Sequence, residues 1–156
     1  MRFVLDESRG ELRVLGKRHF ALAMDSFCSC LDSQVGSRVA EVIMNNLRAQ
    51  DGRARAADTR KEYPEASVEE LIRLLIRYCT LVGLGEAQVT VDKSAEDSIM
   101  VDVLHPYASG VSGSSKPLIA SWWCGALGML FDRRFSSKSL AYDPESDLLK
   151  CVLVSK

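Results

Sequence analysis

The sequence has little of several things that would point directly to a function. Its 156 residues include two histidines, four prolines and two tryptophans, and 20 basic residues nearly balance 21 acidic ones, which leaves a formal net charge of −1. Two histidines are too few for a histidine-rich metal site. A net charge this small excludes a global field that would draw the chain to nucleic acid or to an anionic membrane. We therefore expect no nucleic-acid partner.

The chain also has no charge-free apolar run of about 18 residues, the length that a membrane-spanning helix needs. Acidic residues already occur in the opening sequence MRFVLDESRGELRVL, where a signal peptide would need an uninterrupted apolar core. These two absences predict a soluble, cytoplasmic protein without a transmembrane segment. Its length suits a single domain with one core, over residues 1–156.

The five cysteines do not form a regular pattern. They stand at positions 28, 30, 79, 124 and 151, an odd number at uneven spacing, and the last three lie in apolar runs. Reduced thiols packed in a core are favoured over a disulfide framework. Cys28 and Cys30 would point about 200° apart on a helix, which does not suit chelation of a metal.

Short apolar runs separated by turn residues predict three hairpins. Their strands are expected at residues 2–5 and 12–15, 86–91 and 98–104, and 139–142 and 148–154. The regular alternation in EAQVTV and SIMVDVL is typical of half-buried strands.

Helical spacing of apolar residues predicts the elements between the hairpins. It covers residues 22–47, where we expect Gly36 to divide two helices or to bend one. The sequence Ser67-Val-Glu-Glu70 matches a capping box, so a helix should run from there to about Val82. Residues 48–64 have almost no long apolar side chain and end in proline. We expect a solvated helix end and loop there, the best candidate for disorder.

The segment Pro117–Phe131 (PLIASWWCGALGMLF) mixes bulky and small residues on one predicted helix. Trp122 and Trp123 can fill a pocket, while Gly125 and Gly128 let a neighbouring backbone approach, which suggests either a binding cavity or a tight packing seam. Adjacent residues on a helix point about 100° apart. Either one tryptophan lines a cavity while the other packs or lies at a dimer seam, or both pack in the core.

Three further side chains have both a functional and an ordinary interpretation. His105 ends a strand just before Tyr107 and a loop of residues 105–116, so it either meets a ligand or caps the loop. Arg133 and Arg134 follow the apolar helix, where they either bind an anion or complement the helix dipole in solvent. No sequence feature orients a nucleophile and a base for catalysis, and we expect no enzyme.

Five short motifs together carry a resemblance to a known family. They are Val14-Leu-Gly-Lys-Arg18, Val35-Gly-Ser-Arg-Val39, Leu81-Val-Gly-Leu-Gly85, Trp123-Cys-Gly-Ala-Leu-Gly128 and Leu149-Lys-Cys-Val-Leu153. In this order and spacing they span nearly the whole chain, which resembles the 4-vinyl reductase domain family. That family is related to the small Bet-type subunits of the TRAPP vesicle-tethering complex.

The resemblance implies an α+β fold, with an antiparallel sheet of four to six strands packed against about four helices and a cavity between the layers. Because bacterial and archaeal members commonly sense small molecules as dimers, it implies a non-enzymatic domain that binds or senses an apolar or aromatic ligand as a homodimer. The alternative is a scaffold like the TRAPP subunits, which pair with a related subunit for complex assembly or vesicle tethering. The expected ligand contacts are Trp122, Trp123, His105 and Tyr107.

Zinc-containing sensory members of the family resemble this chain near its end. Cys151 matches their final cysteine, whereas Asp143 stands where its partner should be and Ala120 stands near the position of an earlier cysteine. Zinc needs about four ligands, and this alignment supplies at most two. We therefore expect no metal and no other cofactor, with Cys151 and Asp143 as the weak candidates.

Overall fold

The computed structural model describes residues 3–6, 11–14, 17–19, 24–91, 98–106 and 116–156. Its contacts divide the chain into two compact units, residues 1–40 and residues 41–156. The expectation of a single domain over residues 1–156 stays a prediction.

The first unit contains a three-stranded antiparallel sheet and a helix. Its elements are β1 (Phe3–Asp6), β2 (Glu11–Val14), β3 (Lys17–His19) and α1 (Met24–Val35). The predicted opening hairpin is confirmed, because β1 pairs with β2. Strand β3 was not predicted, since its three residues are all basic. Gly36 has a φ of +80° and separates α1 from the next helix, α2 (Ser37–Glu62), which confirms the predicted division.

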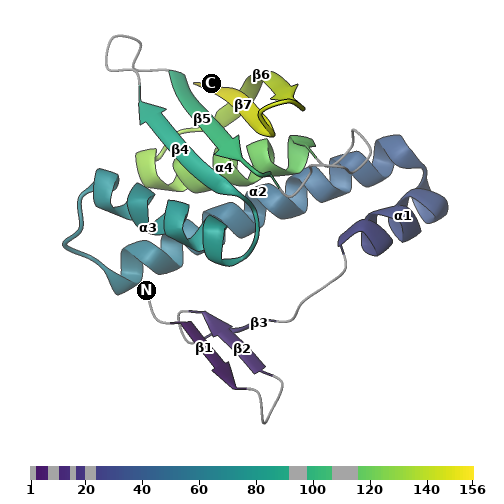
Figure 1. Ribbon diagram of the computed structural model, residues 1–156. Helices are drawn as coiled ribbons and strands as arrows, with labels where there is room; N and C mark the ends of the chain where they lie inside the picture. The colour runs from purple at the N-terminus through teal and green to yellow at the C-terminus, as the bar shows by residue number, and fades with distance from the viewer. Residues whose placement is uncertain (1–2, 7–10, 15–16, 20–23, 92–97, 107–115) are drawn as a thin grey trace. The chain divides into compact units, whose positions relative to one another are not determined.

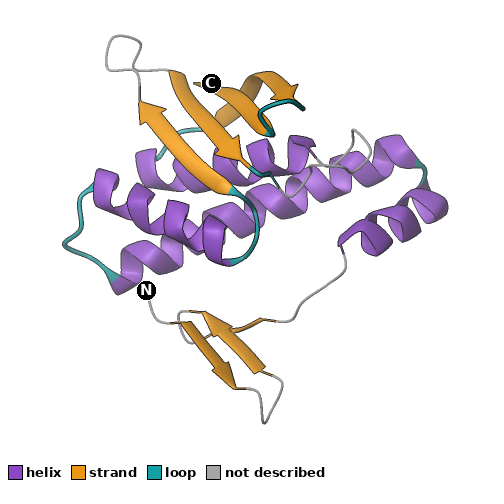
Figure 2. Ribbon diagram, viewed as in Figure 1, coloured by secondary structure: helices purple, strands orange, loops and turns teal. Residues whose placement is uncertain are grey.

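The second unit holds the rest of α2, two more helices and a four-stranded sheet. Its further elements are α3 (Val68–Leu81), β4 (Glu86–Val91), β5 (Ser98–Leu104), α4 (Lys116–Phe131), β6 (Phe135–Asp143) and β7 (Leu148–Ser155). The strand order is β4-β5-β7-β6, and every neighbouring pair is antiparallel (Figure 2). The expected α+β fold class is confirmed. Strand β6 begins before the predicted Ser139 because an irregularity between Ser137 and Ser139 breaks the alternation.

The core of this unit lies between the sheet and its helices. Alternate side chains of β5 and β7 are buried on one face of the sheet, among them Val101, Leu149 and Leu153. Helices α3 and α4 lie against the sheet, α3 beside β4 and α4 beside β6 and β7 (Figure 1). Helix α4 is buried around most of its circumference because α2 packs against it as well.

The predicted loop at residues 48–64 is wrong. Helix α2 continues to Glu62, and Gly52, Ala56 and Thr59 are buried on it. The prediction failed because it sought long apolar side chains, whereas small residues bury a helix when the neighbouring backbone comes close. The end of this segment is therefore part of the core.

Helix α3 begins as predicted. The Glu70 backbone N–H donates to Ser67 Oγ at 3.2 Å, and the Ser67 backbone N–H donates to Glu70 Oε2 at 2.8 Å, so the capping box is complete. The buried residues of this helix are Leu71, Ile72, Leu75, Tyr78 and Cys79.

Within the described parts of the chain, no helix is both long and apolar enough to cross a membrane. The most apolar helix, α4, has 16 residues. The cytoplasmic location stays a prediction.

Candidate ligand-binding site

Helices α2 and α4 meet backbone to backbone at two glycines. A Cβ atom at Gly125 would overlap the backbone oxygen of Ala49, and one at Gly52 would overlap the backbone oxygen of Trp122. Only glycine allows this approach at either position. Of the two alternatives for the apolar helix, the structure therefore shows the tight packing seam, which we call the α2–α4 seam.

Three side-chain hydrogen bonds hold the α2–α4 seam together along its length. Ser121 Oγ donates to Asn45 Oδ1 at 2.9 Å, Trp122 Nε1 donates to Asp51 Oδ2 at 2.8 Å, and Arg60 Nη2 donates to the backbone oxygen of Leu130 at 2.9 Å. The last bond satisfies a carbonyl near the end of α4, where the helix offers no internal partner.

Both tryptophans are buried, each with 1% of its surface exposed. The Trp122 ring stacks on Tyr78 with centroids 6.0 Å apart, and Trp123 meets Trp122 edge to face at 5.1 Å. The Arg55 guanidinium lies over the Tyr78 ring, 4.5 Å from its centroid. We call Asp51, Arg55, Tyr78 and Trp122 the helical cluster.

Burial in the helical cluster raises the pKa values of two groups, the Tyr78 hydroxyl and the adjacent Cys79 thiol. Burial raises the pKa of Tyr78, and Asp51 raises it further, while Arg55 acts in the opposite direction. Burial, followed by the Asp51 charge, also raises the pKa of the Cys79 thiol. At neutral pH, therefore, the Tyr78 hydroxyl and the Cys79 thiol are uncharged.

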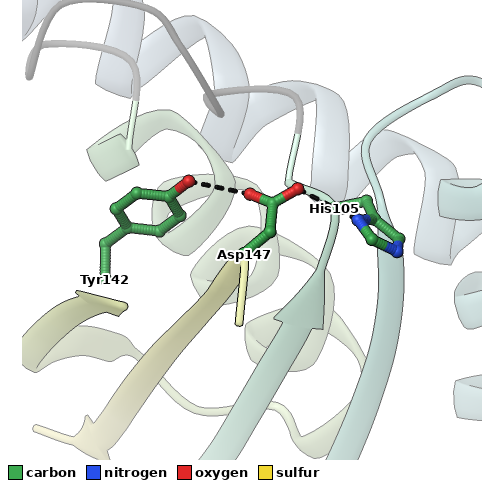
Figure 3. Close-up of polar contacts among 3 residues, drawn as sticks. All are labelled: His105, Tyr142 and Asp147. Carbon is green, nitrogen blue, oxygen red and sulfur yellow. Dashed lines mark hydrogen bonds and ion pairs between the residues drawn. The ribbon is translucent and has the colours of Figure 1, made fainter. Parts of the chain in front are cut away.

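His105 belongs to a second polar group, at the end of the sheet (Figure 3). Its Nδ1 lies 3.0 Å from Asp147 Oδ2, and Tyr142 donates from its hydroxyl to Asp147 Oδ1 at 2.8 Å. The backbone N–H of His105 donates to the backbone oxygen of Asp147 at 2.9 Å, and both residues have φ near 48°. We call His105, Tyr142 and Asp147 the sheet-end cluster.

In the sheet-end cluster the carboxylate is the common acceptor. The hydrogen bond to His105, and then the one to Tyr142, lowers the pKa of Asp147, and the same bond raises the pKa of Tyr142. The His105 side chain is 71% exposed. His105 therefore differs from the two tryptophans in both exposure and contacts, and it is not part of the helical cluster. Tyr107 lies outside the described residues.

A groove lies between α3 and β4, and its cavity volume is about 620 Å³. Its lining residues are Val68, Glu69, Ile72, Arg73, Ile76, Val89, Thr90, Val91 and Phe131. We call it the α3–β4 groove. Neither tryptophan lines it, but Phe131 at the end of α4 does. The sequence analysis did not predict this groove. The pattern that could have indicated it is the i, i+4, i+8 spacing of Val68, Ile72 and Ile76 together with the alternation in β4.

The two weak metal candidates do not share a site. Cys151 pairs with Leu140 across β6 and β7, whereas Asp143 pairs with Leu148, three positions away along β6. An odd offset puts the two side chains on opposite faces, about 10 Å apart along the strand. Asp143 instead accepts bonds from the Glu145 backbone and the Ser146 hydroxyl.

The Cys151 thiol is also a poor ligand. It is buried, and burial is the main cause that raises its pKa to about 12. Among the described residues, no group of three or more His, Cys, Asp or Glu side chains could hold a metal ion. Cys151 and Asp143 therefore do not fit a zinc site. The four cysteines whose side chains are described, Cys30, Cys79, Cys124 and Cys151, are free thiols.

One solved structure aligns with nearly the whole chain. It is described as the crystal structure of the phenol-responsive sensory domain of the transcription activator PoxR with phenol. The TM-score is 0.76 at 12% sequence identity, and the alignment covers 99% of this chain and 84% of that chain. The two chains share a fold.

Two solved structures of the kinds that the sequence resembles align more loosely. One is a trafficking protein particle complex subunit 3 from Naegleria fowleri covalently bound to palmitic acid, with a TM-score of 0.49, 11% identity and coverage of 85% of this chain and 94% of that chain. The other is a vinyl-4-reductase family protein from Methanocaldococcus jannaschii, with a TM-score of 0.47, 18% identity and coverage of 88% and 83%. Alignments this loose carry no conclusion about function. No protein-family model and no curated protein matches the sequence.

Proposed function

We propose that this protein is a non-enzymatic domain that binds and senses a small apolar or aromatic molecule, and that it acts as a dimer. The observation that carries the proposal is the fold shared with a phenol-responsive sensory domain over 99% of this chain. Fold alone does not assign a function, so the proposal also needs a binding site, or seat, for the ligand.

The α3–β4 groove is the seat that the geometry supports best. Its volume of about 620 Å³ falls within the usual range for small-molecule sites, which are mostly apolar with a few polar groups. Aliphatic side chains from α3 and β4 line it together with the Phe131 ring, and Glu69, Arg73 and Thr90 supply the polar groups. An aromatic molecule would bury its ring against these aliphatic groups.

The experiment uses phenol as the probe, with thermal-shift and fluorescence titrations of the intact chain. Ile76→Trp fills the α3–β4 groove and should abolish saturable phenol binding. Leu81→Trp is the matched control, because Leu81 is exposed on the same helix and does not line the groove. Equal binding by both variants would place the ligand elsewhere. No saturable binding by the unaltered chain, to phenol or to larger aromatic alcohols, would contradict the proposed function.

The aromatic residues expected from the sequence remain a second seat. Trp123→Phe keeps an aromatic ring where Trp123 now meets Trp122, so it should leave phenol binding intact if the groove is the seat. If Trp123→Phe weakens binding while Ile76→Trp does not, the ligand lies beside Trp122 and Trp123. If His105→Ala alone does so, the ligand uses the other expected contacts, His105 and Tyr107. Mass spectrometry of the recovered phenol should find it chemically unchanged, as a non-enzymatic role requires.

An apolar patch on α2 supports the dimer. Val42, Ile43 and Leu47 are 57%, 37% and 48% exposed, and helical geometry puts them on one side of α2. Exposed apolar residues gathered on one face are typical of an interface. Val42→Glu should convert a dimer to a monomer in light scattering, whereas Leu81→Glu, on exposed α3 surface, should not. An unaltered chain that is monomeric at micromolar concentration would contradict the dimer.

The same patch favours the alternative, a scaffold like the TRAPP subunits that pairs with a related subunit. The two functions differ in the ligand. A scaffold should keep its assembly state when Ile76→Trp blocks the groove, and it should show no stabilisation by phenol.

A further inference from the structure

A second pocket is lined by residues of α2 and α4 and by the segments at the ends of β6 and β7. It has a cavity volume of about 520 Å³, and α2, the α2–α4 seam and the ends of β6 and β7 form its walls. Its lining residues are Asn46, Ala49, Gln50, Arg53, Cys124, Gly125, Arg134, Phe135 and Lys156. We call it the basic pocket. It shares no lining residue with the α3–β4 groove.

The charged side chains of the basic pocket all have one sign. Arg53, Arg134 and Lys156 line it, and none of the described lining residues is acidic. These cations come from separate elements: Arg53 from α2, Arg134 from the turn before β6, and Lys156 from the residue after β7. The backbone N–H of Lys156 donates to the backbone oxygen of Arg134 at 2.8 Å, which holds the two segments together. The fold thus gathers positive charge that the sequence disperses.

The remaining walls suit an organic molecule. Asn46 and Gln50 offer amide groups from one side of α2, and Phe135 offers an aromatic face. Cys124 adds no competing charge, because burial raises the pKa of its thiol to about 11 even though the Lys156 charge acts in the opposite direction. At neutral pH no side chain among these lining residues is an anion that would neutralise the two arginines.

We propose that the basic pocket binds a small organic anion, with its carboxylate or phosphate group held by Arg53 and Arg134 and its apolar part against Phe135. A guanidinium presents donors in a planar fork that matches both oxyanions, and such charge-assisted bonds are stronger than neutral ones. Of the two sequence alternatives for Arg133 and Arg134, this assigns anion binding to Arg134. The site is separate from the apolar ligand site proposed above, and it gives the domain a second, charged input.

The test measures binding of benzoate and phenyl phosphate by isothermal titration and by amide NMR shifts, with benzyl alcohol as the neutral analogue. Both anions should shift the amide signals of the basic pocket saturably and benzyl alcohol should not, since any binding of this neutral alcohol belongs to the α3–β4 groove, and the tighter anion identifies the preferred oxyanion. Arg53→Gln and Arg134→Gln should each weaken binding by about fivefold or more, because each removes a charge-assisted bond. Arg73→Gln, at the α3–β4 groove, is the matched control and should leave the affinity for both anions unchanged. Rising NaCl should weaken binding because it screens exposed charges.

Two results would overturn the proposal. One is the absence of saturable binding by either anion, and the other is a loss of affinity in Arg73→Gln equal to that in Arg53→Gln. Arg53 and Arg134 are exposed, so these variants should keep the unaltered melting temperature, and Arg53→Lys should recover part of the affinity. Phenol titration of Arg53→Gln separates this proposal from the proposed function, since phenol binding should survive in that variant.

Discussion

The helical cluster and the sheet-end cluster use the same polar contact in two different surroundings. In each, an aspartate accepts a 2.8 Å hydrogen bond from an aromatic side chain, Trp122 to Asp51 in one and Tyr142 to Asp147 in the other. The donor Trp122 is 1% exposed, whereas the donor Tyr142 is half-buried and the sheet-end histidine beside it is 71% exposed. The geometry of the two bonds is alike, but the access of water is not.

This difference in burial determines how much each hydrogen bond contributes to the stability of the fold. A buried donor that loses its acceptor bears the full cost of desolvation, whereas an exposed donor replaces the acceptor with water. The helical cluster should therefore contribute mainly to stability. The sheet-end cluster should mainly set protonation states and hold the turn between β6 and β7. Three perturbations test this contrast.

The largest effect is expected where the α2–α4 seam buries the helical cluster. Gly125→Ala forces a methyl group into the backbone of Ala49, so we expect a loss of about 3 kcal/mol in the free energy of unfolding, measured by urea denaturation. An ordinary helical glycine would instead gain about 1 kcal/mol from the same change. Gly52→Ala should behave like Gly125→Ala. Arg53→Ala, at the next and exposed position, should change stability little, and a stable Gly125→Ala protein would mean that the helices are not in backbone contact.

A middle effect is expected at the aspartate of the helical cluster. Asp51→Ala leaves the buried Trp122 Nε1–H without this acceptor, and we expect a loss of about 1–3 kcal/mol in the free energy of unfolding. Asp51→Asn keeps an amide oxygen and should lose less. Asp147→Asn, the same change in the sheet-end cluster, should lose less than Asp51→Asn. If the two asparagine variants unfold at the same urea concentration, burial does not separate the clusters.

The smallest effect is a change in the pH dependence of the sheet-end cluster. The folded pKa of Asp147 is below its unfolded value, so its contribution to stability is present above the unfolded pKa and is lost as pH falls through the folded pKa. His105→Ala should move the Asp147 pKa back toward its ordinary value in a carbon-detected NMR titration. Tyr142→Phe should do the same to a smaller extent, because His105 is the larger cause. An Asp147 pKa unchanged in both variants would contradict the contacts.

The sequence predicts much of the fold because local signals agree with it. The capping box at Ser67, the left-handed turn at Gly36 and the alternation in β4 and β5 each appear in the structure at the expected residues. The long second half of α2 could not be predicted in the same way. Besides Arg55, its buried residues are Gly52, Ala56 and Thr59, and their burial depends on close packing rather than on their own hydrophobicity.

The candidate sites are less predictable because they join distant segments. The basic pocket combines residues near positions 50, 124, 134 and 156, and no local pattern connects them. The tryptophans were a clear signal, but their partners Asp51 and Tyr78 lie 71 and 44 positions before Trp122 (122 − 51 and 122 − 78). Of the expected ligand contacts, His105 lies at the end of a strand as predicted, but its partner Asp147 is 42 positions away and could not be predicted from local pattern.

The interlocked glycines of the α2–α4 seam also constrain how the two helices can move relative to each other. Sliding α4 along α2 by one helical turn, about 5.4 Å, would drive side chains into the backbone at Ala49 and Trp122. The two helices are therefore held in a single register and should move together as a rigid body. On the proposed function, a ligand in the α3–β4 groove would therefore shift α3 and the sheet relative to these two helices, rather than one helix along the other.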